Sequence, residues 1–173
     1  MSKIKTVGIV GTGVIGTGWI IRNLAHNKIV HAYDQNKNLK SYVLKEIKRT
    51  SKSIKKLFGK KILIKNLKFF NSLEKALVNV DFVQESVLEN YKVKTDLIKK
   101  ISKYVKSNVI ISSSSSGLLP SKIFSKSKNP QRGIIGHPFN PAYLLPAVEI
   151  VPGKKTTKKF LLDANKYYKS ISM

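Results

Sequence analysis

Cysteine is absent from the 173 residues of this chain. The chain therefore has no disulfide, no thiolate nucleophile and no zinc site with sulfur ligands. Histidine is scarce as well, with only 3 residues, so we expect no metal site built from histidines. No apolar stretch is long enough to cross a bilayer. The candidate functional groups that remain are the glycine-rich loops and a small set of acidic and basic side chains.

The N-terminal stretch resembles a secretory signal, because Lys3 and Lys5 precede an apolar run from 7 to 21. Four glycines interrupt that run, and no small-residue cleavage site follows it. A signal peptide is therefore not the favoured interpretation. Together with the lack of cysteine, this predicts a cytoplasmic protein that makes no contact with membranes.

Acidic residues are few, with 9 Asp and Glu against 33 Lys and Arg, which gives a net charge of +24. A nucleic acid or another polyanion has to be considered as a partner. Only three basic residues are arginine, however, and base and phosphate recognition relies on the guanidinium fork. Scattered lysine indicates solvated surface. The stretch 37–68, with eleven lysines and Glu46 as its single acid, keeps a polyanion-binding module as an alternative.

Apolar runs alternate with amphipathic segments along nearly the whole chain. Strands are predicted at 3–10, 29–33, 67–70, 81–85, 108–111, 132–137 and 147–151. Helices are predicted at 14–27, 36–58, 72–79, 90–105 and 157–170, the last with Thr157 as its N-cap. The alternation is typical of a Rossmann-type, doubly wound, mostly parallel α/β sheet with helices on both faces, formed by a single domain. Ligands of such folds lie beyond the carboxyl ends of the strands, where the serine run 112–116 is predicted to form a loop.

A phosphate-binding loop is predicted between the first strand and the first helix, where the motif GTGVIG begins at Gly11. Gly11 permits a tight turn, Gly13 lets the backbone approach a pyrophosphate, and Gly16 lets the helix pack against the strand. Val14 and Ile15 stand in the first helical turn, whose free N–H groups attract phosphate. This spacing and context predict a dinucleotide site.

Asp34 ends the second predicted strand, at the distance from the glycine loop where a carboxylate holds the ribose 2′-hydroxyl of a dinucleotide. Its charge repels a 2′-phosphate, so NAD is predicted in preference to NADP. Lys37 and Lys40 lie close by in sequence and soften that repulsion.

Three further blocks carry a family resemblance together with the glycine loop. They are FVQES running on to Glu89, SSSSSGLLP ending at Pro120, and GHPFNPAYLLPAVEIVPG from 136 to 153. The chain resembles the NAD-binding domain of the 3-hydroxyacyl-CoA dehydrogenase family over nearly its whole length. Within the family the blocks look most similar to the carnitine 3-dehydrogenase branch, with the gulonate 3-dehydrogenase branch and the acyl-CoA enzymes as alternatives. The resemblance implies NAD-dependent oxidation of a small 3-hydroxy substrate to its 3-oxo product.

The resemblance also implies roles for individual residues. The family's general base falls at His137, the carboxylate that pairs with it at Glu149, and a serine that contacts substrate and nicotinamide at Ser116. Positions that contact NAD in the family fall at Glu89, Lys94 and Asn140.

The chemistry of these residue types agrees with those roles. Alcohol oxidation needs a base for the hydroxyl proton, and histidine has a suitable pKa. Glu149 stands among Val148, Ile150 and Val151, which predicts that it lies in a buried strand. An unpaired buried carboxylate is costly, so His137 is its natural partner.

The family has a helical C-terminal domain, for substrate binding and dimerisation, that has no counterpart in this sequence. We therefore expect a separate chain or further residues to supply it, a homo-oligomer when it is complete, and poor turnover by this chain alone. A catalytically inactive Rossmann remnant is the remaining alternative.

Overall fold

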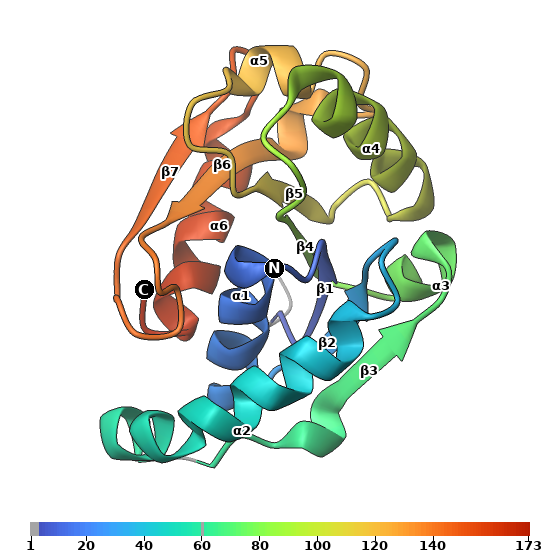
Figure 1. Ribbon diagram of the computed structural model, residues 1–173. Helices are drawn as coiled ribbons and strands as arrows, with labels where there is room; N and C mark the ends of the chain where they lie inside the picture. The colour runs from blue at the N-terminus through green and yellow to red at the C-terminus, as the bar shows by residue number, and fades with distance from the viewer. Residues whose placement is uncertain (1–3, 60) are drawn as a thin grey trace.

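In the computed structural model, residues 4–59 and 61–173 are described, and they form one sheet of seven strands (Figure 1). The strands are β1 (Thr6–Val10), β2 (Ile29–Tyr33), β3 (Leu67–Phe70), β4 (Phe82–Glu85), β5 (Ile110–Ser113), β6 (Gly133–Pro138) and β7 (Val148–Pro152). Their order is β3-β2-β1-β4-β5-β6-β7, and only β7 runs antiparallel to its neighbour. The predicted Rossmann-type, mostly parallel sheet is confirmed.

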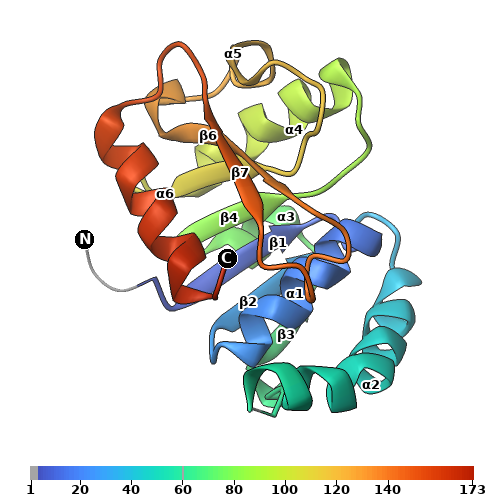
Figure 2. The ribbon, with the colours of Figure 1, turned by 90° about the vertical axis from the view of Figure 1, so that its left-hand side faces the viewer.

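The helices cover both faces of the sheet (Figures 1 and 2). They are α1 (Val14–Ala25), α2 (Leu39–Phe58), α3 (Leu73–Leu77), α4 (Tyr91–Tyr104), α5 (Pro120–Ile123) and α6 (Lys158–Ser170), with 3₁₀ turns η1 (Ile64–Asn66) and η2 (Pro130–Arg132). The single turn α5 is not predicted from the sequence, although proline at its first position suits a helix start.

Two apolar cores lie on opposite faces of the sheet. Residues of α1, α2 and α6 form one core, in which Trp19 is fully buried as predicted. Residues of α3, α4 and α5 form the other. Strand β4 is buried throughout, and its Phe82 and Val83 belong to different cores. Because both faces of β4 are covered, its side chains must be apolar or fully partnered.

Two sequence-based expectations about local structure need correction. Ser112 and Ser113 belong to β5 rather than to the loop after it, because they continue the parallel pairing with β4. Thr157 occupies the N-cap of α6, but its side chain makes no capping hydrogen bond. The start of the first predicted strand, Lys3, lies outside the described residues.

The prediction that Glu149 lies in a buried strand is wrong. Its side chain is 58% exposed, because β7 is the antiparallel edge strand of the sheet, with β6 as its neighbour in the strand order. An edge strand alternates its side chains between covered and open positions, which the apolar sequence around Glu149 does not reveal.

The lysines of α2 lie on its exposed side, whereas Val43, Ile47 and Ile54 are buried in the core that α2 shares with α1. Polyanion binding by this helix stays a prediction, and Lys60 of the same basic stretch lies outside the described residues. In the described part of the chain, none of the helices has the length and apolar character needed to span a membrane.

Candidate functional site

The glycine loop follows β1 at the carboxyl edge of the sheet. Gly11 has a φ of +89°, and a Cβ there would lie 2.7 Å from the carbonyl oxygen of Ser86. A Cβ on Gly16 would lie 1.8 Å from the carbonyl oxygen of Gly11, so only glycine allows α1 to pack this closely on the loop. Both glycines are therefore required by the fold itself.

Gly13 differs from its two neighbours in the motif. It is the N-cap of α1, and a Cβ built on it meets no atom within 4 Å. The fold does not need glycine at this position. The open space lies directly in front of the N–H groups of the helix, where a pyrophosphate is attracted. The geometry therefore fits the dinucleotide predicted from the sequence.

Asp34 lies just beyond β2 and is tied to the glycine loop. Its Oδ2 accepts hydrogen bonds from the backbone N–H of Thr12 at 2.6 Å and from the Thr12 hydroxyl at 3.3 Å. Its Oδ1 accepts from the N–H of Asn36 at 2.9 Å. The carboxylate is thus fixed in orientation and keeps an acceptor position on Oδ1 for a ribose hydroxyl.

A cavity of about 1100 Å³ opens at this edge. Its walls include Gly11 and Gly13 after β1, Asp34 after β2, Ser86 after β4, and Val93 on α4. The sheet order reverses between β1 and β4, which is the point where open α/β sheets bind their ligands. The cavity is therefore placed as a dinucleotide site requires.

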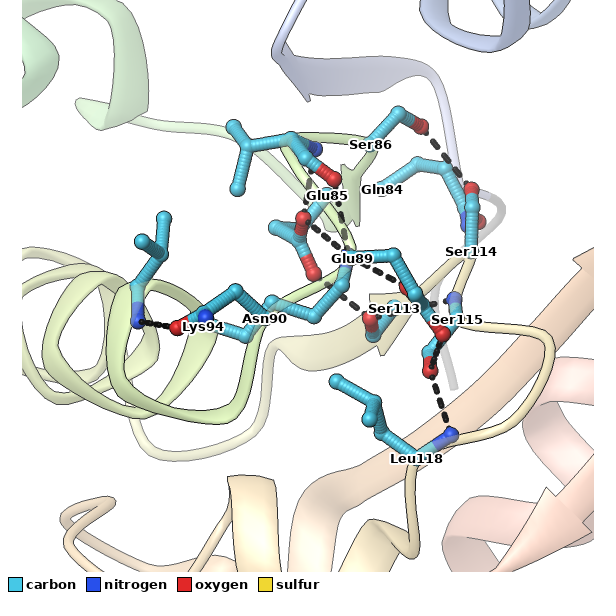
Figure 3. Close-up of polar contacts among 12 residues, drawn as sticks. Gln84, Glu85, Ser86, Glu89, Asn90, Lys94, Ser113, Ser114, Ser115 and Leu118 are labelled. Carbon is cyan, nitrogen blue, oxygen red and sulfur yellow. Dashed lines mark hydrogen bonds and ion pairs between the residues drawn. The ribbon is translucent and has the colours of Figure 1, made fainter.

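A buried ion pair joins α4 to the end of β4 (Figure 3). Lys94 and Glu85 have side chains that are 1% and 0% exposed, and Nζ lies 2.8 Å from Oε1. The second oxygen of Glu85 accepts from the Ser113 hydroxyl at 2.5 Å. The pair therefore ties β4 and α4 to the end of β5. Lys94 is held by these partners, by Glu89 at 3.5 Å and by the Val87 carbonyl, rather than presented to solvent.

Glu89 holds the loop that follows β5. Its Oε1 accepts hydrogen bonds from the Ser115 hydroxyl at 2.5 Å and from the backbone N–H groups of Ser116 and Gly117. Burial alone would raise the pKa of Glu89, but these hydrogen bonds and the charge of Lys94 outweigh it and lower that pKa. Glu89 thus acts as the anchor of the serine loop and sets the position of Ser116, whose own side chain is exposed.

His137 and Glu149 meet across the β6–β7 pair, where they are register partners. Nδ1 of His137 lies 2.8 Å from Oε2 of Glu149, and the imidazole is 27% exposed. Because a carboxylate only accepts, Nδ1 carries the proton. Nε2 has no partner among residues 4–59 and 61–173, so it is open to a reactant. The pairing predicted for these two residues is present.

Arg22 of α1 holds the loop between β6 and β7 through hydrogen bonds. This buried guanidinium donates to the carbonyls of Ala142 at 3.0 Å and Leu145 at 2.8 Å, and to that of Ser172 at 3.3 Å. Burial lowers the pKa of Arg22 to about 10. The helix that begins at the glycine loop therefore also holds the loop that joins the strands of His137 and Glu149.

The remaining predicted residues occupy different places at this edge. Val14 is 59% exposed beside the open space at Gly13, and Ile15 packs against a core. Asn140 is exposed in the loop after β6, and within the described part of the chain no hydrogen bond joins its side chain to the glycine loop.

Sequence reasoning missed the roles of Thr12, Glu85, Ser113 and Arg22. Glu85 had a usable signal, because an acid inside an otherwise buried strand demands a partner. Glu85, and not the exposed Glu149, is the buried strand carboxylate of this sheet edge. Arg22 had a weaker signal, since it interrupts the apolar face of a helix.

Comparison with known proteins places this arrangement among dehydrogenases. Residues 6–173 match the family model described as 3-hydroxyacyl-CoA dehydrogenase, NAD binding domain. An L-carnitine dehydrogenase of Oceanobacillus iheyensis is 42% identical over 98% of this chain and 56% of its own length. One from Pseudomonas syringae is 39% identical over 100% of this chain and 55% of its own length. The chain spans about half the length of these curated relatives.

Solved structures of dehydrogenases have a similar fold. An (S)-3-hydroxybutyryl-CoA dehydrogenase from Ralstonia eutropha superposes with a TM-score of 0.85 at 26% identity, over 98% of this chain and 62% of that chain. A 3-hydroxybutyryl-CoA dehydrogenase from Escherichia coli gives a TM-score of 0.89 at 24% identity, over 98% of this chain and 37% of that one. The second comparison shows the fold alone.

Proposed function

The chain belongs to the 3-hydroxyacyl-CoA dehydrogenase family as its NAD-binding domain, and from this premise we propose that it is the cofactor half of an enzyme that oxidises L-carnitine at its 3-hydroxy group. The hydrogen bond between His137 and Glu149 is the observation that carries the proposal. NAD, when bound, supplies the acceptor for the hydride. The glycine loop holds its pyrophosphate, and Asp34 its adenosine ribose.

In this proposal His137 removes the hydroxyl proton of the substrate at Nε2. Glu149 fixes the ring through Nδ1, so that Nε2 faces the reactant with a lone pair, and it stabilises the positive charge that the ring gains. The pair stands at the end of β6, three strands from Gly11, or about 14 Å across the sheet. An extended dinucleotide that starts at the glycine loop crosses that distance along the carboxyl edge.

Ser116 is proposed to contact the substrate and the nicotinamide end, because Glu89 fixes its backbone N–H between β5 and β6. Asn140, in the loop after His137, is proposed to contact the cofactor on the same side. Glu89 and Lys94 support the cofactor site by holding the serine loop and the end of β4.

The choice of L-carnitine is supported by the names of the relatives with 39–42% identity. L-gulonate and a 3-hydroxyacyl-CoA are the competing substrates. We further propose that residues beyond this half, in the same or a separate chain, complete the substrate pocket and the oligomer, because the relatives are about twice as long.

A chimaera tests the proposal, in which this chain is joined to the second half of the Oceanobacillus iheyensis relative. NADH formation is followed with L-carnitine, L-gulonate and 3-hydroxybutyryl-CoA. We expect turnover with L-carnitine first, and a loss of at least about 100-fold in His137→Asn, with NADH affinity within about twofold. A folded chimaera that binds NADH and oxidises L-carnitine no faster than its His137→Asn form would overturn the proposal.

A further inference from the structure

Ser114 sits at the centre of a set of donors just beyond β5. Its Oγ lies 2.8 Å from Nε2 of Gln84 and 2.8 Å from Oγ of Ser86, two residues that Figure 3 shows beside it. It also lies 3.0 Å from Nε1 of Trp19. An indole N–H only donates, so Trp19 uses one of the two lone pairs of Ser114.

The amide of Gln84 is fixed in orientation by its other contacts. Its Nε2 also faces the carbonyl oxygen of Gly136 at 3.2 Å, and a carbonyl only accepts. The NH₂ group therefore points to both Gly136 and Ser114, and it uses the second lone pair of Ser114. With both lone pairs filled, the hydroxyl proton of Ser114 has to be donated, and Ser86 is its acceptor within the described residues.

The rest of the chain of hydrogen bonds agrees with this direction. The Tyr168 hydroxyl donates to Oε1 of Gln84 at 2.8 Å, and the Ser112 hydroxyl, also 2.8 Å away, then donates to Tyr168. Gly136 leaves the room that the tyrosine needs, since a Cβ there would lie 1.8 Å from the phenolic oxygen. One direction therefore runs from Ser112 through Tyr168, Gln84 and Ser114 to Ser86.

Ser86 ends this chain with its own proton unused. Its Oγ accepts from Ser114, and within residues 4–59 and 61–173 its hydroxyl has no acceptor. The residue is half-buried and lines the cavity beside Gly11 and Gly13. A hydroxyl held in one direction at a cavity wall is a preorganised donor for a ligand oxygen.

We propose that the Ser86 hydroxyl is a cofactor-binding donor for an oxygen of NAD on the nicotinamide side of the adenosine. The side follows from the sheet order β2-β1-β4. Asp34 follows β2 and takes the adenosine ribose, the glycine loop follows β1, and Ser86 follows β4 on the far side. Its acceptor is a pyrophosphate oxygen, a hydroxyl of the second ribose or the nicotinamide carboxamide. The inference rests on NAD binding, the premise of the proposed function.

Calorimetric titrations of the full chain with NADH, ADP-ribose and AMP test the inference in wild type, Ser86→Ala, Ser86→Thr and Ser53→Ala. Ser53 is an exposed serine of α2, away from the cavity, and its variant is the matched control. Thermal unfolding of each variant checks the fold. We expect Ser86→Ala to weaken NADH binding about 3- to 10-fold, as the loss of one hydrogen bond predicts. AMP binding stays within about 1.5-fold, and Ser86→Thr, which keeps the hydroxyl, binds more tightly than the alanine variant.

If Ser86→Ala binds ADP-ribose more weakly to the same extent as NADH, the result supports Ser86 as a donor and places the acceptor on the pyrophosphate or the ribose. If Ser86→Ala weakens the binding of NADH alone, the result also supports Ser86 as a donor and places the acceptor on the carboxamide. Unchanged NADH affinity in Ser86→Ala overturns the inference while leaving the proposed function intact, and so does an equal loss for AMP. A wild-type chain that binds no NADH removes the premise, and both fail together.

Discussion

His137 and Glu149 are direct register partners in the antiparallel pair β6–β7, and Nδ1 lies 2.8 Å from Oε2. The turn between the two strands returns the chain so that residues twelve positions apart face each other. The cofactor cavity is built differently, from parallel strands whose carboxyl ends gather at one edge. His137 stands near the carboxyl end of β6, at the same edge of the sheet. Under the proposed function, the antiparallel pair therefore supplies the base and the parallel strands supply the cofactor site.

Replacing Glu149 by alanine separates catalysis from cofactor binding. The imidazole loses the acceptor that fixes Nδ1, so we expect kcat of the chimaera with L-carnitine to fall about 10- to 100-fold. The affinity for NADH, titrated by calorimetry, stays within about twofold, because Glu149 does not line the cavity. Parallel losses of turnover and NADH binding would contradict the assigned role.

Gly13 and Gly16 are expected to respond in opposite ways to alanine. Gly13→Ala leaves the melting temperature nearly unchanged, because its Cβ meets no atom, yet it weakens NADH binding by about 10-fold or more by filling the pyrophosphate space. Gly16→Ala places a Cβ against the Gly11 carbonyl and destabilises the fold by about 1–3 kcal/mol or more. Thermal unfolding and NADH titration of both variants check this. A large fall in the melting temperature of Gly13→Ala would contradict the conclusion that a methyl group fits at this position without a clash.

Asp34→Ala is expected to change the choice of cofactor. It removes the acceptor for the ribose hydroxyl and the charge that repels a 2′-phosphate, so NADH affinity falls about 10-fold and NADPH affinity rises. Thr12 also loses the partner of its N–H, which adds to the loss for NADH. The ratio of the two dissociation constants, measured by calorimetry, is the readout. An unchanged ratio would show that Asp34 does not contact the ribose.

Acid is expected to loosen the serine loop through Glu89. The pKa of this carboxyl in the folded chain lies below its ordinary 4.5, because hydrogen bonds from Ser115 and Gly117 outweigh the effect of burial. Its contribution to stability is therefore fully present above about pH 4.5 and is lost as the pH falls through the lower folded value. Glu89→Gln should lose less stability than wild type between about pH 5 and pH 3, measured by chemical unfolding at each pH. If the free energy of unfolding fell equally with pH in the two proteins, the ionised Glu89 would not be what holds the serine loop.

Arg22 is expected to be irreplaceable by lysine. Its fork reaches three carbonyls from one buried position, and an ammonium cannot satisfy that geometry. Arg22→Lys and Arg22→Met should both lower the free energy of unfolding by about 2–4 kcal/mol, since buried carbonyls lose charged donors. Urea unfolding is the measurement. Full stability in Arg22→Lys would contradict the role of the guanidinium in holding this loop.

The sequence predicts the fold well because its strands and helices have distinct periodicities and its glycine loop has a fixed context. Neither periodicity nor spacing reveals the partner of Glu85, since that partnership depends on how α4 settles against β4 and β5. The exposure of Glu149 depends on β7 being an edge strand, which is a property of the whole sheet. The His137–Glu149 pair is predicted both by the family resemblance and by the cost of burying an unpaired Glu149. The second argument reaches the observed partner although Glu149 is 58% exposed.

A calorimetric titration of the purified chain with NADH, and separately with NADPH, tests the account most directly. The glycine loop and Asp34 predict saturable NADH binding with a preference of about 10-fold or more over NADPH. No binding of NADH, or equal binding of both cofactors, would contradict the account of the cavity at the carboxyl edge of the sheet.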